Sequence, residues 1–295
     1  MLALVQTALE QGFIYGILAM GVVLSFRLLD FPDLTIDGSF TLGGAVTAIL
    51  IVHSVHPVVA VFFACVVGGC AGLLTGVLHG QLKITKLLSG ILVMTMLYSL
   101  NLRIMGRANI SLLDRPTIFR WLERDDVISR WTAAVLLLVF VTLVFFLLKW
   151  FLSTEIGGAI RAVGDNESMA VSVALPTETL KLVGLAVSNA LVALSGSLLC
   201  QQQAFADIGV GVGTLVTALA SIIIGEVFVA PSSLGKLLLG CIFGAVTYFT
   251  IVNLALRLGI APTDLKLATA LLVILALATG MLPGKEMLLV VRRKY

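Results

Sequence analysis

The chain has 295 residues, of which 59% are hydrophobic and 12% are charged. Its mean hydropathy of +1.12 excludes an ordinary water-soluble protein, a disordered chain and a coiled coil rich in Glu and Lys. The formal net charge of +3 is too small to indicate a nucleic-acid partner. The apolar runs are long and unbroken, unlike the alternating strands of a β-barrel, so we expect helices in a lipid bilayer.

A helix that crosses the bilayer needs about 20 mainly apolar residues. Runs free of Lys, Arg, Asp and Glu predict an all-α, polytopic membrane protein with eight or nine transmembrane helices, forming one domain over residues 1–295. The second and seventh runs are short and rich in glycine, so re-entrant segments are the alternative there. The predicted spans centre on residues 11–26, 38–52, 57–82, 87–102, 131–148, 182–206, 208–225, 237–256 and 267–284.

Basic residues between these runs predict the orientation of the chain. Eleven of the 19 Lys and Arg residues then lie in the cytoplasm, with the N-terminus outside and segment 153–179 inside. Loop 106–130 is predicted to be external, and it contains Pro116 and Trp121. It is either a docking surface for an external partner or a long solvated connector.

Residues 37–48 and 207–218 share a pattern that begins with Asp, contains several glycines and ends in Val-Thr-Ala. On the predicted topology the two stretches enter the membrane from opposite sides, as inverted repeats do in many transporters. Glycine-rich membrane helices also resemble one another because close packing favours small residues. An inverted internal repeat and common packing chemistry are therefore both open.

Motifs of catalysis and metal binding are missing from the sequence. The three histidines lack a zinc-like spacing, no phosphate-binding loop is present, and the four cysteines lie in apolar runs without a CxxC pair. We therefore expect no enzyme active site, cofactor or metal in this chain. Acidic residues gather at the ends of the predicted spans, whereas an ion-driven carrier buries carboxylates in mid-membrane. This pattern assigns the energy source to another subunit.

A polar stretch, residues 32–39, opens the second span. Pro32 and Gly38 are expected to break the helix, and the polar side chains between them either line a solute path or cap the span near the cytoplasmic surface. Three asparagines within apolar runs can bind a solute or join neighbouring helices. The candidates for the translocation path are Asp33, Thr35, Asp37, Ser39 and Asn189.

Segment 153–179 predicts a short helix, a break at Gly164 and a second helix capped by Asp165 or Asn166. A rigid knuckle of this kind can transmit force from a soluble partner, although a plain connector has the same composition. Residues 157–170 resemble the coupling segment of permease subunits in bacterial ABC importers of the branched-chain amino acid and ribose type. Residues 31–43 resemble a narrower group of that family, described as tryptophan/tyrosine transport permeases.

The resemblance covers nearly the whole chain, with a departure at residues 174–176, where the family has Gly followed by an aliphatic residue. It implies two permease copies in the bacterial inner membrane, each docked on a cytoplasmic ABC ATPase that holds ATP and Mg, and fed by an extracytoplasmic solute-binding protein. The solute would be small and polar, an amino acid and within the narrower group an aromatic one. A self-sufficient secondary transporter or channel is the alternative. The residues that would couple to the ATPase are Gly157, Arg161, Ala162, Gly164, Asp165, Asn166 and Ala170.

Overall fold

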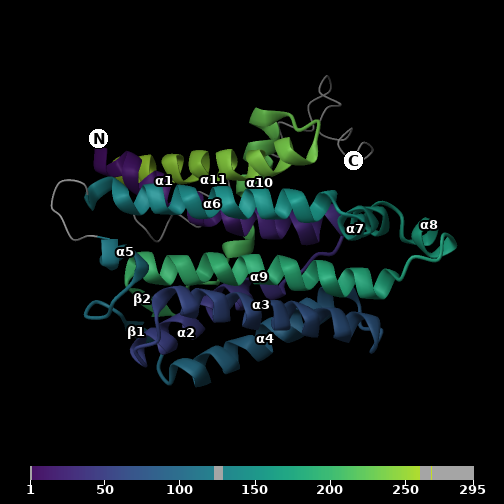
Figure 1. The fold of residues 1–295 in the computed structure, drawn as a ribbon, viewed down its shortest axis with the longest axis horizontal. Helices are drawn as coiled ribbons and strands as arrows, with labels where there is room; N and C mark the ends of the chain where they lie inside the picture. Colours follow the sequence, from purple (N-terminus) through teal and green to yellow (C-terminus); the bar gives the residue numbers. More distant parts are fainter. Residues whose placement is uncertain (1, 123–128, 260–266, 268–295) are drawn as a thin grey trace.

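The protein is an elongated bundle of helices (Figure 1). The computed structural model describes residues 2–122 and 129–259, together with Leu267. The long helices are α1 (Leu2–Val22), α2 (Thr35–Val52), α3 (Pro57–Gly80), α4 (Lys86–Met105), α6 (Ser129–Ser153), α9 (Thr177–Gln203) and α11 (Leu234–Arg257). The shorter elements are the π-helix η1 (Val23–Leu28), α5 (Ile118–Leu122), α7 (Glu155–Asp165), α8 (Glu167–Ser172), α10 (Thr214–Val229) and the strands β1 (Asn109–Ser111) and β2 (Phe205–Asp207).

Seven of the described helices are long and apolar enough to cross a membrane. The polytopic, helical class predicted from the sequence is thereby confirmed. Eight of the nine predicted spans correspond to helices, but the seventh is α10, which has only 16 residues. The ninth, 267–284, lies outside the described residues except for Leu267. The number of crossings therefore stays a prediction.

The helices run between two ends of the bundle. The N-terminus, α5 and the strand pair lie at one end, called here the β end, and α7 and α8 lie at the other, called the α8 end (Figure 1). The described part of loop 106–130 and segment 153–179 are therefore separated by the length of the bundle. Which end faces the cytoplasm stays a prediction from the basic residues.

Helix α9 runs along the middle of the bundle and contacts α1, α2 and α3. Small residues let these helices approach closely, as is common in membrane proteins. A Cβ on Gly43 of α2 would lie 2.0 Å from the carbonyl oxygen of Ala193, and one on Gly72 of α3 would lie 2.2 Å from that of Leu185. Thr47 of α2 also donates a hydrogen bond of 2.6 Å to Ser197 of α9. The packing of α9 thus depends on glycine at the contact points.

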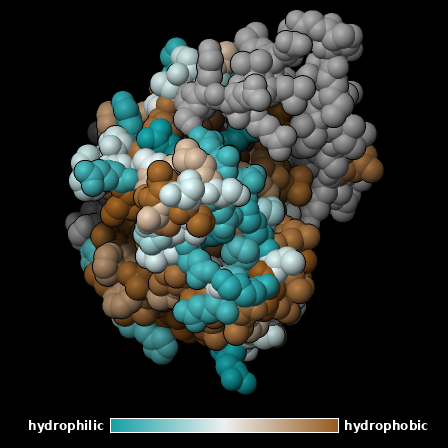
Figure 2. All heavy atoms as spheres, turned by 90° about the vertical axis from the view of Figure 1, so that its right-hand side faces the viewer, coloured by the Kyte–Doolittle hydropathy of each residue, from teal (hydrophilic) through white to brown (hydrophobic). Residues whose placement is uncertain are grey.

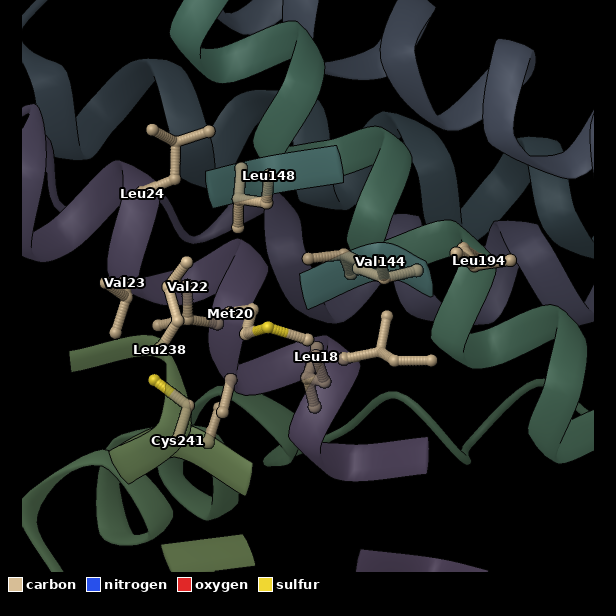
Figure 3. Packing of buried hydrophobic residues seen from close by; sticks show 14 of the residues in the cluster. Leu18, Met20, Val22, Val23, Leu24, Val144, Leu148, Leu194, Leu238 and Cys241 are labelled. Atoms are coloured by element: carbon tan, nitrogen blue, oxygen red, sulfur yellow. The ribbon is translucent and has the colours of Figure 1, made fainter. Parts of the chain in front are cut away.

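The main hydrophobic core fills the space between α1, α6, α9 and α11. Figure 3 shows part of it, where Leu18 and Met20 of α1 lie beside Val144 of α6. Cys241 of α11 belongs to the same cluster. All four side chains are almost completely buried. All four cysteines of the apolar runs are free thiols; Cys200 and Cys241 are buried in the packing, whereas Cys70 is exposed.

A two-stranded antiparallel sheet closes the β end. Asn109 pairs with Asp207, and Ser111 pairs with Phe205. The sheet ties the segment after α4 to the segment after α9. It was not among the sequence predictions, because strands of three residues are too short to produce a recognisable alternation of polarity.

The two stretches of the suggested repeat differ in local structure. Residues 37–48 lie within α2, whereas 207–218 comprise the end of β2, a turn and the start of α10. They meet in space, because a Cβ on Gly211 would lie 2.1 Å from the carbonyl oxygen of Asp37. An inverted repeat stays a prediction.

Two adjacent glycines of α2 test the close packing against α9. Gly43→Ala should lower the free energy of unfolding by about 1–3 kcal/mol, because the added methyl group collides with the backbone of α9. Gly44→Ala is the matched control, since its nearest contact would be an ordinary 3.5 Å. Thermal unfolding in detergent, followed by size-exclusion chromatography, measures both. Equal midpoints for the two variants would contradict the proposed contact.

Candidate functional site

The helical path of the chain is interrupted between α1 and α2. Helix α1 ends in η1, a π-helical turn, and π-helical turns occur frequently at functional sites. Asp30 then adopts a positive φ of 50°, and the chain folds back into the bundle through Phe31 and Asp33, both completely buried. The backbone amide of Thr35 donates to Asp33 Oδ1 at 2.9 Å, which starts α2. Irregular backbone of this kind is tolerated within a membrane only where protein surrounds it.

Asp33 and Ser39 meet Asn189 in the interior of the bundle. The amide nitrogen of Asn189 donates to Asp33 Oδ2 at 2.7 Å, and Ser39 Oγ donates to the amide oxygen of Asn189 at 2.7 Å. All three residues have no exposed surface. Three of the five predicted path residues therefore form one hydrogen-bonded group. The described conformation is closed around it.

This group lies inside the bundle, beside the middle of α9. Asn189 is halfway along the 27 residues of α9, and its partner Asp33 also lies close to Gly90 in the first turns of α4. That Asp33 lies near the cytoplasmic surface stays a prediction, whereas its burial follows from the break folding back into the bundle. Because Asp33 is buried among the helices, the absence of buried carboxylates no longer argues against an ion-driven carrier.

Thr35 and Gly38 tie the start of α2 to two further helices. Thr35 Oγ1 and Thr75 Oγ1 of α3 lie 2.7 Å apart. The amide nitrogen of Asn101 in α4 donates to the carbonyl oxygen of Gly38 at 3.2 Å. The start of α2 is thus joined through polar contacts to α3, α4 and α9. The predicted role of the buried asparagines as links between helices is confirmed for Asn101 and Asn189.

Asp37 caps α10 rather than its own helix. Its carboxylate accepts hydrogen bonds from the backbone amides of Gly213 and Leu215, both at 2.9 Å, and from the hydroxyl of Thr214 at 3.0 Å. Gly213 occupies the N-cap position of α10 with a φ of 87° and has no side chain to satisfy the free amides. The suggestion that Asp37 or Thr35 caps the second span is therefore wrong. The sequence did contain one signal for this contact. The glycine-rich stretch 209–213 leads into α10 without a side chain that could cap the helix, so a cap from elsewhere was to be expected.

The two carboxylates form no ion pair with any described residue, although a helix N-terminus compensates Asp37. Asp33 has only neutral donors around it. A buried carboxylate in this setting can receive a cationic group such as an ammonium, or a proton. Together with the hydroxyls of Thr35 and Ser39 and the amide of Asn189, it provides the chemistry to bind a small polar solute once the helices separate.

The predicted coupling segment forms α7 and α8 at the α8 end. Thr154 caps α7 by accepting from the amide of Gly157 at 3.3 Å. Helix α7 continues through Gly164 to Asp165, so the prediction of a break at Gly164 is wrong. The chain turns at Asn166, whose side chain accepts from the amide of Met169 at 3.0 Å and caps α8. Of the two predicted caps, Asn166 is confirmed.

The glycines of α7 do not break the helix; they allow it to pack closely against neighbouring backbone. A Cβ on Gly164 would lie 2.0 Å from the carbonyl oxygen of Leu28, and one on Gly157 would lie 2.5 Å from Leu152 Cα. Helix α7 therefore packs directly against the end of η1 and α6. The remaining predicted residues differ in exposure: Arg161 and Ala162 are half-buried, Asp165 is exposed, and Ala170 is buried.

Arg161 has no ion-pair partner among the described residues and donates only a long hydrogen bond of 3.4 Å to the carbonyl oxygen of Gly157.

The ion pair of this region was not predicted: Lys181 of α9 binds Glu167 of α8. The hydrogen bond from Lys181, with the nearby charges of Lys181, Lys86 and His79, holds the pKa of the Glu167 carboxyl below its ordinary value. The carboxylate therefore stays ionised at neutral pH. Fourteen residues separate the pair in sequence, beyond the reach of helical spacing rules.

Helix α8 presents an exposed surface. Met169, Val171 and Val173 are 51%, 59% and 62% exposed, respectively. Figure 2 shows this end of the molecule, where hydrophilic residues gather across the middle and hydrophobic residues border them. Exposed apolar side chains on a helix that projects from the bundle can contact another protein.

The fold and these sites define a multi-pass membrane protein with a buried polar break and a protruding helix pair, the class to which solute permeases belong. Residues 4–278 match the family described as the branched-chain amino acid transport system permease component. The chain belongs to this family. The resemblance inferred from residues 31–43 and 157–170 is thereby confirmed.

Three relatives are similar over most of their length. A tyrosine transport system permease protein of Clostridioides difficile is 43% identical, over 93% of this chain and 90% of that protein. An uncharacterized protein of Rickettsia prowazekii is 35% identical, over 92% of this chain and 96% of that protein. A ribose import permease protein of Haemophilus influenzae is 21% identical, over 95% of this chain and 85% of that protein. No solved structure matches significantly.

The link between Asn189 and Asp33 can be tested by stability. Asn189→Ala removes a donor from a buried carboxylate and the acceptor of Ser39, so we expect the free energy of unfolding to fall by about 1–3 kcal/mol. Asn253→Ala is the control, because Asn253 reaches Gln11 over 3.4 Å at a partly buried position. It should cost less than about 1 kcal/mol. Thermal unfolding in detergent compares them, and an equal loss in both would argue against the buried group.

Proposed function

We propose that this chain is the membrane-spanning permease subunit of an ATP-driven importer in the bacterial inner membrane, and that its solute is an aromatic amino acid. The permease class rests on the family match. The solute rests on the relative named for tyrosine transport, which is 43% identical over 93% of this chain. The proposal assigns ATP and Mg to a cytoplasmic ATPase and solute capture to an extracytoplasmic binding protein, with two permease copies forming the pathway.

The observation that carries the ATP-driven mechanism is the position of α8. The helix stands out at one end of the bundle with exposed apolar side chains, while the buried Ala170 and the capping Asn166 hold it in a defined orientation. Behind it, Gly164 fits α7 directly against the backbone of Leu28. A rigid projection of this kind is suited to receive a push from a soluble motor. Arg161 and Asp165 would orient or border the contact.

The proposed solute path runs past the break between η1 and α2. In the described conformation Asp33, Ser39 and Asn189 bond to one another, and Asp37 bonds to α10. Movement of α9 relative to α2 would free these polar groups for the ammonium and other polar atoms of an amino acid. The cycle would then alternate between closed and open arrangements of a bistable bundle.

A self-sufficient secondary transporter is the second candidate. The specific observation in its favour is Asp33, a buried carboxylate before α2 that contacts Asn189 of α9 and has no ion-pair partner among the described residues. Such a group suits ion or proton coupling. The two candidates differ in whether the permease works alone.

Reconstitution separates the two candidates. Proteoliposomes that contain the permease together with the ATPase and the binding protein encoded beside it should accumulate labelled tyrosine only when ATP is supplied. Permease alone should leave the label outside. Equilibration of tyrosine by permease alone, down its gradient, would instead support the secondary transporter.

Val171→Glu tests the role of α8. The exposed side chain would place a charge in an apolar contact, so we expect affinity for the ATPase to fall at least about tenfold. Leu113→Glu, at the β end, is a matched control because both side chains are 59% exposed. Copurification of the ATPase with each variant is the measurement. Normal retention by Val171→Glu would remove α8 from the interface.

A further inference from the structure

Two ion pairs join the start of α9 to neighbouring segments. Glu178 binds Lys83, which follows α3, and Lys181 binds Glu167 at the start of α8 with a distance of 2.5 Å between Nζ and Oε1. Positions three residues apart lie on the same face of a helix, so both pairs are on one side of α9. They differ in burial. The side chains of Lys83 and Glu178 are 73% and 53% exposed, whereas that of Lys181 is only 8% exposed.

The short connection between α8 and α9 makes the buried pair important. Residues 173–176 join the two helices, and Ala174 in this link adopts a positive φ of 58°. Ala170 is the one buried residue of α8, and it packs into the main core. Without Glu167 and Lys181, α8 would be attached to α9 mainly through this link and one methyl group. A buried lysine that loses its carboxylate also leaves an uncompensated charge.

Lys181 stands on the same helix as the buried polar group. Asn189 follows it by eight residues, which corresponds to about 12 Å along α9. Between them, Gly184 packs against Leu29, at the start of the break that leads to Asp33. A displacement of α8 that pulls on Lys181 therefore acts on the helix that holds Asp33 and Ser39 in place.

We propose that Lys181 is a positioning residue that fixes α8 to α9 through Glu167, so that motion imposed on α8 by the ATPase reaches Asn189 and the break before α2. This role rests on the proposed function, since it requires an ATPase that acts on α8. Lys83 and Glu178 have no such role, because their exposed pair connects α9 to a surface loop.

The test measures the tyrosine taken up per ATP hydrolysed by the complete complex of permease, ATPase and binding protein in proteoliposomes. Lys181→Met keeps the apolar stem but removes the charge, and Glu167→Gln breaks the same ion pair from the side chain that is 46% exposed. Both should lower the ratio at least about fivefold while ATP hydrolysis continues. The exchange Glu167→Lys with Lys181→Glu should restore at least half of the ratio. Lys83→Met should leave it within about twofold.

Each outcome decides the matter. An unchanged ratio in Glu167→Gln overturns the proposal. A parallel fall in uptake and hydrolysis that the exchange does not restore also overturns it, because Lys181 would then serve stability alone. Absence of ATP-dependent uptake in the unaltered complex rejects the proposed function itself, and the inference with it, before any variant is compared.

Discussion

A carboxylate buried within a membrane bundle requires donors for its oxygens, and the centre of this protein is arranged around that requirement for Asp33. The amide of Asn189 provides one donor and the backbone of Thr35 the other. Asn189 can reach Asp33 only because α2 and α9 approach closely, and glycines permit that approach. Removal of either the donor or the small residues would disturb the same contact. The polar group and the helix packing are therefore two parts of one arrangement.

Helix α9 connects the separate parts of the molecule. It packs against α1, α2 and α3 along the middle of the bundle, and its first turns carry the ion pairs to α8 and to the segment after α3. The same helix leads at its far end into β2, which pairs with β1. Both ends of the protein thus contact one rigid element. Such an element can relate events at the two membrane surfaces without any soluble domain.

Much of the fold could be predicted from the sequence because long apolar runs have few alternatives in a membrane. The capping role of Asn166 was also accessible, since it depends on neighbouring residues alone. The burial of Asp33 was not, because it results from a backbone that folds back after η1, and local patterns do not describe such a path. The same holds for Asp37 and Lys181. Their partners lie at least 14 residues away in sequence, and only the packing of the helices brings them together.

The N-terminus of α10 is completed by a side chain that precedes it by more than 170 residues. Gly213 provides no capping side chain, and Asp37 satisfies two amides at the point where α10 begins. During synthesis, α2 leaves the ribosome long before α10. The carboxylate that caps α10 is therefore synthesised before the amides that it binds. The start of α10 thus gains its cap only when the later segment folds against α2.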